Sequence, residues 1–128
     1  GGVIDGKLYV AGGRMTSIPS TTPATFELAD GTWQTKAPML TGRGGTACGV
    51  IADRLIVVGG EGNPQASSGV FPQVEAYTPA SDAWESLDPM LTPRHGMGAA
   101  ASGGKLYVPG GATVQGFGAV ATHEILTP

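Results

Sequence analysis

The sequence predicts an all-β fold built from about two and a half copies of one repeating unit, each unit holding four short antiparallel strands. The first observation is an apolar segment that recurs and runs each time into a pair of glycines. The three segments are Lys7–Val10 before Gly12–Gly13, Arg54–Val57 before Gly59–Gly60, and Lys105–Val108 before Gly110–Gly111. The second observation is that no long stretch spaces its apolar positions at the period of a helix.

A second series of residues recurs at a constant interval of 51 residues. Its members are Trp33 and Trp84, Pro38–Thr41 and Pro89–Thr92, and Arg43 and Arg94. The two series divide the chain into residues 1–40, a copy lacking most of its first strand, residues 41–91, a complete copy, and residues 92–128, a copy lacking its last strand. The whole chain is therefore predicted to form a single partial domain of stacked repeats.

The complete copy contains four strand-like segments, which follow one another in order. Residues 46–51 are mostly small, which suits a strand crowded against its neighbours near a central axis. Residues 55–58 are continuously apolar, as expected for a strand that is covered on both faces. Residues 74–78 and 83–87 complete the unit, and turn residues separate the four segments. Such a unit corresponds to one blade of a β-propeller, with the small-residue strand innermost.

The recurring glycines and aromatic residues have physical roles in this interpretation. A diglycine at a strand end supplies positive φ and a close backbone approach that a Cβ atom would prevent. Tyr77 and Trp84 are expected to fill the wedge between adjacent blades, where burial of each ring contributes about 2–3 kcal/mol. Phe26 and Trp33 are expected to do the same one copy earlier.

These residues resemble kelch repeats, which combine a diglycine, an aromatic residue before a tryptophan, and a Pro-Met-Leu-Thr-x-Arg segment at intervals of about 50 residues. The resemblance covers essentially the whole chain and implies a β-propeller. The segment from Pro93 to Glu124 is similar to the closing repeat of bacterial kelch proteins of the galactose-oxidase-like superfamily, and this resemblance leads us to expect Pro128 near a natural C-terminus. The departures from the pattern are Phe26 in the first copy and Leu126 in the third, each in the place of Tyr77, and Ala24 in the place of Glu75.

The number of copies is too small for a closed ring. Closed propellers have about 4–8 blades, and an open stack exposes an apolar blade face at each end. We therefore expect the remaining blades to come from a longer parent chain, or from self-association of this one.

Composition excludes several classes of partner and chemistry. The net charge is −3 with no basic run, which argues against a nucleic-acid partner, and no apolar stretch is long enough to predict a membrane span. One cysteine and two histidines leave no ligand set for a metal, and glycine-rich matches to nucleotide-binding loops lack a following helix. No cofactor, no metal and no complete catalytic constellation are predicted.

Comparison among the copies separates scaffold residues from candidate ligand-binding residues. Arg43 and Arg94 recur, so one hypothesis makes them structural donors to nearby carbonyl groups. The kelch resemblance implies another, in which arginines at this position reach the central cavity and bind acidic peptide segments. His95 takes the place of Gly44 in the previous copy, so the repeat does not require it, and it is either a ligand group or a tolerated surface residue.

The connection after each diglycine varies in length among the copies, and variable loops of repeat proteins often form the binding face. These loops carry Arg14, Glu61, Asn63, Gln115 and Phe117. The predicted function is a binding scaffold that presents six residues to a protein segment or a carbohydrate. These residues are Arg14, Arg43, Glu61, Arg94, His95 and Gln115. The alternatives are a kelch-superfamily enzyme acting on sugars, mutarotase-like or oxidase-like with Arg94 and His95 at its site, and a purely structural segment.

Overall fold

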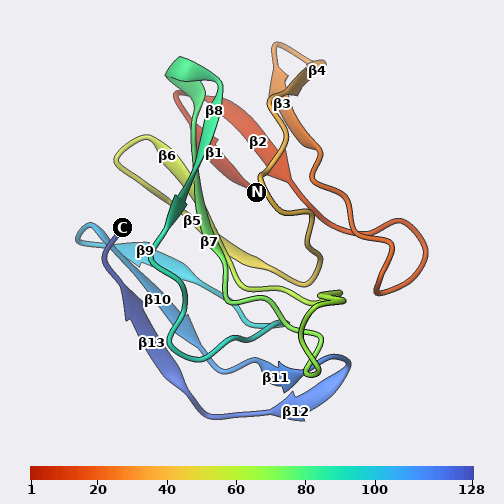
Figure 1. Cartoon of the computed structure of the whole chain (residues 1–128). Helices are drawn as coiled ribbons and strands as arrows, with labels where there is room; N and C mark the ends of the chain where they lie inside the picture. The colour runs from red at the N-terminus through yellow and green to blue at the C-terminus, as the bar shows by residue number, and fades with distance from the viewer.

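The computed structural model describes residues 1–128 and contains three blade-like antiparallel β-sheets, which lie side by side like the ribs of a fan, and one two-stranded hairpin (Figure 1). The first sheet has the order β1-β2-β3-β4, and the second has the order β5-β6-β7-β8. Their strands are β1 (Gly2–Ile4), β2 (Lys7–Ala11), β3 (Thr25–Ala29), β4 (Thr32–Lys36), β5 (Ala47–Ile51), β6 (Arg54–Val58), β7 (Val74–Thr78) and β8 (Ala83–Leu87). The predicted all-β class and propeller architecture are confirmed.

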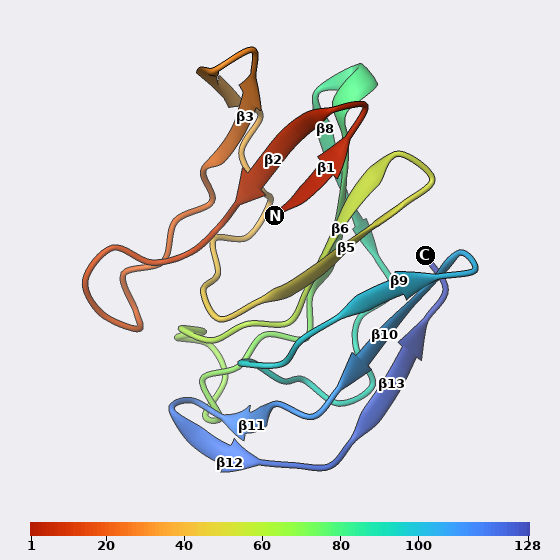
Figure 2. The same cartoon turned by 180° about the vertical axis from the view of Figure 1, so that it is seen from behind.

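The third sheet has three strands in the order β13-β10-β9, with β13 at its open edge (Figure 2). Its strands are β9 (Ala100–Ser102), β10 (Lys105–Pro109) and β13 (His123–Leu126). A separate hairpin, β11 (Ala112–Val114) and β12 (Phe117–Ala119), interrupts the connection from β10 to β13. One 3-10 turn, η1 (Pro79–Ser81), is the only helical segment, and nothing in the structure is a helix able to cross a membrane.

The innermost strands of successive sheets pack closely, because their residues are small. Strand β5 contacts β1 on one side and β9 on the other. A Cβ atom added to Gly49 would lie 3.3 Å from the Cβ of Ala101 and would also collide with the Leu106 side chain. A Cβ atom on Gly2 would meet Val50 of β5 at 2.6 Å. The small-residue strands therefore set the spacing between blades.

Two hydrophobic clusters fill the wedges between the three sheets. Between the first and second sheets, Tyr77 is fully buried, with its ring centroid 5.6 Å from that of Tyr9 and 5.2 Å from that of Trp84. The indole N–H of Trp84 donates to the Ala37 carbonyl of the preceding blade at 3.0 Å. Tyr77 and Trp84 thus lie in the wedge, as predicted from the sequence.

The predicted match of Phe26 to Tyr77 is wrong. Strand register places Leu28 opposite Leu8 and Trp33, as Tyr77 lies opposite Leu55 and Trp84. The tight turn Asp30-Gly31, with φ of 49° and 73°, joins β3 to β4, whereas the β7–β8 connection includes η1. Because the β3–β4 turn is two residues shorter than the β7–β8 connection, Leu28 is the residue that corresponds to Tyr77. Phe26 and Tyr77 lie equally far from their tryptophans in the sequence, but they occupy different positions in their sheets.

Phe26 and Trp33 also differ from the prediction in burial. They are 40% and 54% exposed, because the first sheet has no neighbour on that side. Val3 is 60% exposed on the same sheet. The expected apolar blade face at this end of the stack is therefore present.

Tyr9, which lies between the first and second sheets, makes the stability of the fold sensitive to alkaline pH. Its hydroxyl donates to Glu27 Oε2 at 2.6 Å, and burial, reinforced by that carboxylate, raises the pKa of Tyr9 to about 12. The unfolded chain releases this proton near pH ~10. We therefore expect the contribution of Tyr9 to stability to be complete below pH ~10 and to be lost as pH rises to about 12.

The melting temperature measured across this pH range tests the expectation. Tyr9→Phe should show a shallower alkaline decline than the wild type, although its melting temperature at neutral pH is lower. Tyr77 has a raised pKa too and continues to titrate in both proteins. Parallel declines in the two proteins would contradict the role of Tyr9.

Candidate functional site

The connections after the diglycines lie together at one end of the three sheets and form a loop rim, which comprises residues 12–24, 59–73 and 110–122 (Figure 1). Direct contacts join neighbouring loops. A Cβ atom on Gly62 would meet the Ile18 carbonyl at 2.7 Å, and the backbone N–H of Gln115 donates to the Ser68 carbonyl at 2.8 Å. The rim is therefore one continuous surface.

Glu61 stands at the centre of the rim and connects groups from all three sheets. Its Oε1 atom accepts from Arg14 Nη2 at 2.8 Å, and its Oε2 atom accepts from the Gly116 amide at 3.0 Å. Its side chain is 5% exposed, so the carboxylate is held in place by these donors. Its backbone amide donates to the Gly44 carbonyl at 2.8 Å, which fixes the start of the loop.

His95 completes the same group. Its Nδ1 atom lies 3.4 Å from Glu61 Oε2, and its Nε2 atom lies 2.9 Å from the Val114 carbonyl. Both neighbours are hydrogen-bond acceptors, to which a ring N–H can donate. His95 stands where the previous copy has Gly44, and it bridges Glu61 to the β11–β12 hairpin, which the previous copy lacks.

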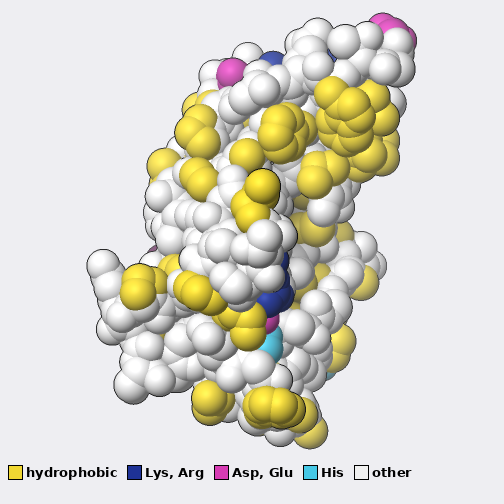
Figure 3. Space-filling model, turned by 90° about the vertical axis from the view of Figure 1, so that its right-hand side faces the viewer, with side chains coloured by type: hydrophobic (Ala, Val, Ile, Leu, Met, Phe, Trp, Pro, Cys, Tyr) yellow, Lys and Arg dark blue, Asp and Glu magenta, His cyan; other side chains and the backbone are white.

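The rim combines this polar group with exposed apolar side chains. Arg14 keeps 34% of its side chain exposed, whereas Met15, Val114 and Phe117 are 79%, 49% and 85% exposed. Figure 3 shows a basic, an acidic and a histidine group next to one another in a hollow of one face, with hydrophobic side chains on either side. A surface of this kind offers charge and apolar contact to the same ligand.

Gln115 contributes mainly to the packing of one loop on the next. A Cβ atom on Gly69 would lie 2.7 Å from Gln115 Oε1, so the amide group covers this glycine. The structure thus brings together Arg14, Glu61, Gln115 and His95, four of the six residues that the sequence nominated for ligand binding. The remaining two, Arg43 and Arg94, are buried elsewhere in the fold.

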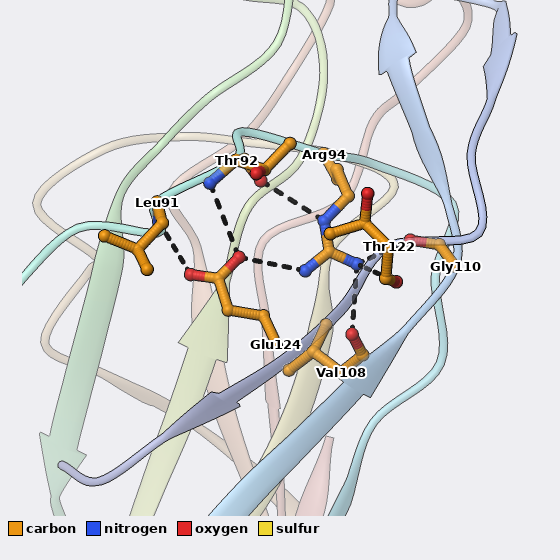
Figure 4. Close-up of polar contacts among 7 residues, drawn as sticks. All are labelled: Leu91, Thr92, Arg94, Val108, Gly110, Thr122 and Glu124. Carbon is orange, nitrogen blue, oxygen red and sulfur yellow. Dashed lines mark hydrogen bonds and ion pairs between the residues drawn. The ribbon is translucent and has the colours of Figure 1, made fainter.

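Arg94 is fully buried, and all three nitrogens of its guanidinium have partners within the chain (Figure 4). Nη2 donates to Glu124 Oε2 at 3.1 Å, and Nε donates to the Thr92 carbonyl at 3.2 Å. Nη1 lies within hydrogen-bond distance of three carbonyl groups, those of Val108, Gly110 and Thr122. Glu124 in turn accepts from the Leu91 amide at 2.6 Å. This network ties the linker between blades to β10 and β13.

Arg43 repeats the arrangement one blade earlier. It donates to Glu75 Oε1 at 3.0 Å and to the Val57 carbonyl at 3.2 Å, and Glu75 accepts from the Leu40 amide at 3.2 Å. Burial lowers the pKa of the Arg43 guanidinium, and Glu75 opposes that shift. The geometry of both arginines favours the structural hypothesis, and ligand contact by either of them stays a prediction.

Sequence reasoning did not identify the partners of these arginines. Glu75 and Glu124 recur in the third strand as the arginines recur ahead of the first, so a recurring carboxylate was the available signal. The β11–β12 hairpin was also missed, because its strands are three residues each. No group of three or more His, Cys, Asp and Glu side chains is arranged to hold a metal ion.

The blades and the loop rim together define a repeat protein of the β-propeller class. Comparison with known proteins supports this, since residues 42–91 match the model of the Kelch motif. Kelch-like protein terF of Aspergillus terreus is 34% identical over 118 residues, which cover 90% of this chain and 26% of that protein. Beta-scruin of Limulus polyphemus is 35% identical over 115 residues, which cover 84% of this chain and 12% of that protein.

A solved structure, that of YjhT, is similar with a TM-score of 0.71 and 26% identity, covering 88% of this chain and 33% of that one. The chain is a partial kelch-repeat β-propeller. It spans about a quarter or less of the length of the two curated relatives named above, 26% and 12%. Both relatives are eukaryotic, so bacterial origin and the galactose-oxidase-like superfamily stay predictions.

Proposed function

We propose that this chain is a protein-interaction module whose loop rim binds an extended segment of a partner polypeptide. The observation that carries the proposal is the convergence of Arg14, Glu61 and His95 at contacts of 2.8 and 3.4 Å, beside exposed apolar side chains. Kelch-repeat proteins generally act as scaffolds for protein interactions, which agrees with this placement.

Each part of the rim has a distinct role in the proposed complex. Arg14 offers a guanidinium that is part exposed and oriented by Glu61, so it suits a carboxylate of the partner. Phe117, on the β11–β12 hairpin, offers an exposed ring that suits an apolar side chain of the partner. Glu61 and His95 are both buried, so they position the exposed groups. The enzymatic alternative gains no support, since every nitrogen of Arg94 is bound within the fold.

A random peptide library displayed on phage and selected on the immobilised chain tests the proposal. We expect enriched peptides to lose at least tenfold in affinity for Arg14→Ala and for Phe117→Ala. Asp53→Ala, in the β5–β6 turn at the opposite end of the sheets, is the matched control and should bind as the wild type does. Enrichment that none of the rim variants affects would overturn the proposal, and glycan binding without peptide binding would replace it with the carbohydrate alternative.

A further inference from the structure

A groove of about 470 Å³ lies between the first two loops of the rim, next to the pair formed by Arg14 and Glu61. The first loop contributes Thr21 to its lining, and the backbone of Thr21 pairs with that of Arg14. The second loop contributes residues 62–65, which directly follow Glu61. Both loops belong to sheets with all four strands, so the groove lies between two complete blades.

The second loop is held in place by its own hydrogen bonds. Asn63 donates from Nδ2 to the Val70 carbonyl at 3.1 Å, and its Oδ1 atom accepts from the backbone N–H of Gln65 at 3.0 Å. The Gly62 amide donates to the Gly69 carbonyl at 2.9 Å. This wall of the groove is therefore formed before a ligand binds, which lowers the entropic cost of binding.

The lining of the groove is neutral and polar. None of its ten residues is charged, and apart from two prolines only Phe71 is hydrophobic. Thr21 and Thr41 offer hydroxyl groups, and Gln65 and Gln73 offer carboxamides. A charged ligand group would lose water here without meeting an opposite charge, and an apolar group would cover polar atoms without pairing them. The groove therefore favours a neutral group that forms hydrogen bonds.

Gln73 shows which hydrogen bond the groove can offer to a ligand. Its side-chain Oε1 atom is buried and has no hydrogen-bond partner, whereas its backbone carbonyl accepts from the Gly59 amide at 2.9 Å. Ala24 and Thr122 accept the same backbone bond in the other two copies, so the blade does not require a carboxamide at this position. Because an unpaired buried acceptor destabilises a fold, this side chain suits a ligand better than it suits the scaffold.

We infer that this groove binds the carboxamide of a glutamine or asparagine side chain of a partner polypeptide. A carboxamide carries a donor and an acceptor side by side, so it can donate to Gln73 Oε1 while it accepts from Gln73 Nε2. Phe71 is 5% exposed, which leaves almost no ring face on which a sugar could stack. The inference adds a specificity to the loop rim but needs neither Arg14 nor Phe117, so it is tested separately from the proposed function.

Three capped tripeptides that differ only in the central residue are the probes. They are acetyl-Ala-Gln-Ala, acetyl-Ala-Glu-Ala and acetyl-Ala-Met-Ala, each with an N-methylamide at the C-terminus. Titrated into the isotope-labelled chain, the glutamine tripeptide should give saturable amide shifts in NMR spectra, concentrated at residues 62–65 and 71–73. The other two should bind at least tenfold more weakly, because a site that pairs with an amide rejects side chains of similar size that lack it.

Two protein variants form a matched pair. Gln73→Met should weaken binding at least tenfold without lowering the melting temperature, because its Oε1 atom has no partner to lose. Gln34→Met, on the exposed strand β4, makes the same replacement away from the groove and should bind as the wild type does. Equal binding of the three tripeptides, or shifts that Gln73→Met does not alter, would overturn the inference. Glucose that shifts the same residues more strongly than the glutamine tripeptide would also overturn it, because a sugar would then be the ligand.

Discussion

Glu124→Ala is expected to lower the free energy of unfolding by about 3–5 kcal/mol. Arg94 is 0% exposed and would keep its positive charge without the carboxylate that lies 3.1 Å away. The Leu91 amide would also lose its acceptor at 2.6 Å. Breaking a buried pair by removing one partner is costly because the remaining charge has little access to water.

Equilibrium urea unfolding measures the loss, and the chain provides its own control. Glu85 pairs with Arg54 at 2.6 Å, but its side chain is 56% exposed. Glu85→Ala removes the same charge and should change stability by about 0–1 kcal/mol. If the two variants lost the same stability, burial of the Arg94 network would not be the source of its strength.

Recurrence in the sequence was sufficient to predict the blades. The diglycines and the interval of 51 residues placed the strands of the complete copy within about a residue of their ends, as for β7 at Val74–Thr78. The predicted positive φ of the diglycines is confirmed, with values from 61° at Gly59 to 123° at Gly60. These features depend on backbone geometry and apolar pattern, which the chain repeats.

The rim was predictable only in part, because its contacts are made once. The sequence nominated Arg14 and Glu61 from variable loops and His95 from a comparison with Gly44, yet 47 and 34 residues separate successive members. A pattern along the sequence does not predict that the Glu61 carboxylate accepts hydrogen bonds from donors in both neighbouring blades. The Phe26 register failed for a related reason, since the length of one turn changed while the interval that was compared did not.

Gly59→Ala is expected to cost about 2–5 kcal/mol, from two sources that add. The residue has φ of +61°, a region that costs an L-residue about 1–2 kcal/mol. A Cβ atom there would also collide with the Arg94 carbonyl and would lie 2.6 Å from Met97 Cε. A backbone carbonyl cannot move aside as a flexible side chain can, so the collision adds an overpacking cost of about 1–3 kcal/mol.

Gly6→Ala separates the two sources. Gly6 has φ of +74°, but no atom lies within 4 Å of the position its Cβ would take. Urea unfolding of this variant should therefore show only the conformational cost, about 1–2 kcal/mol. A loss in Gly59→Ala no greater than in Gly6→Ala would mean that φ alone requires the glycine. A larger loss in Gly59→Ala, which we expect, would mean that close packing also requires the glycine. The segment that leads into the next blade passes against Gly59, and the Gly60 amide donates there to the Arg94 carbonyl at 2.9 Å.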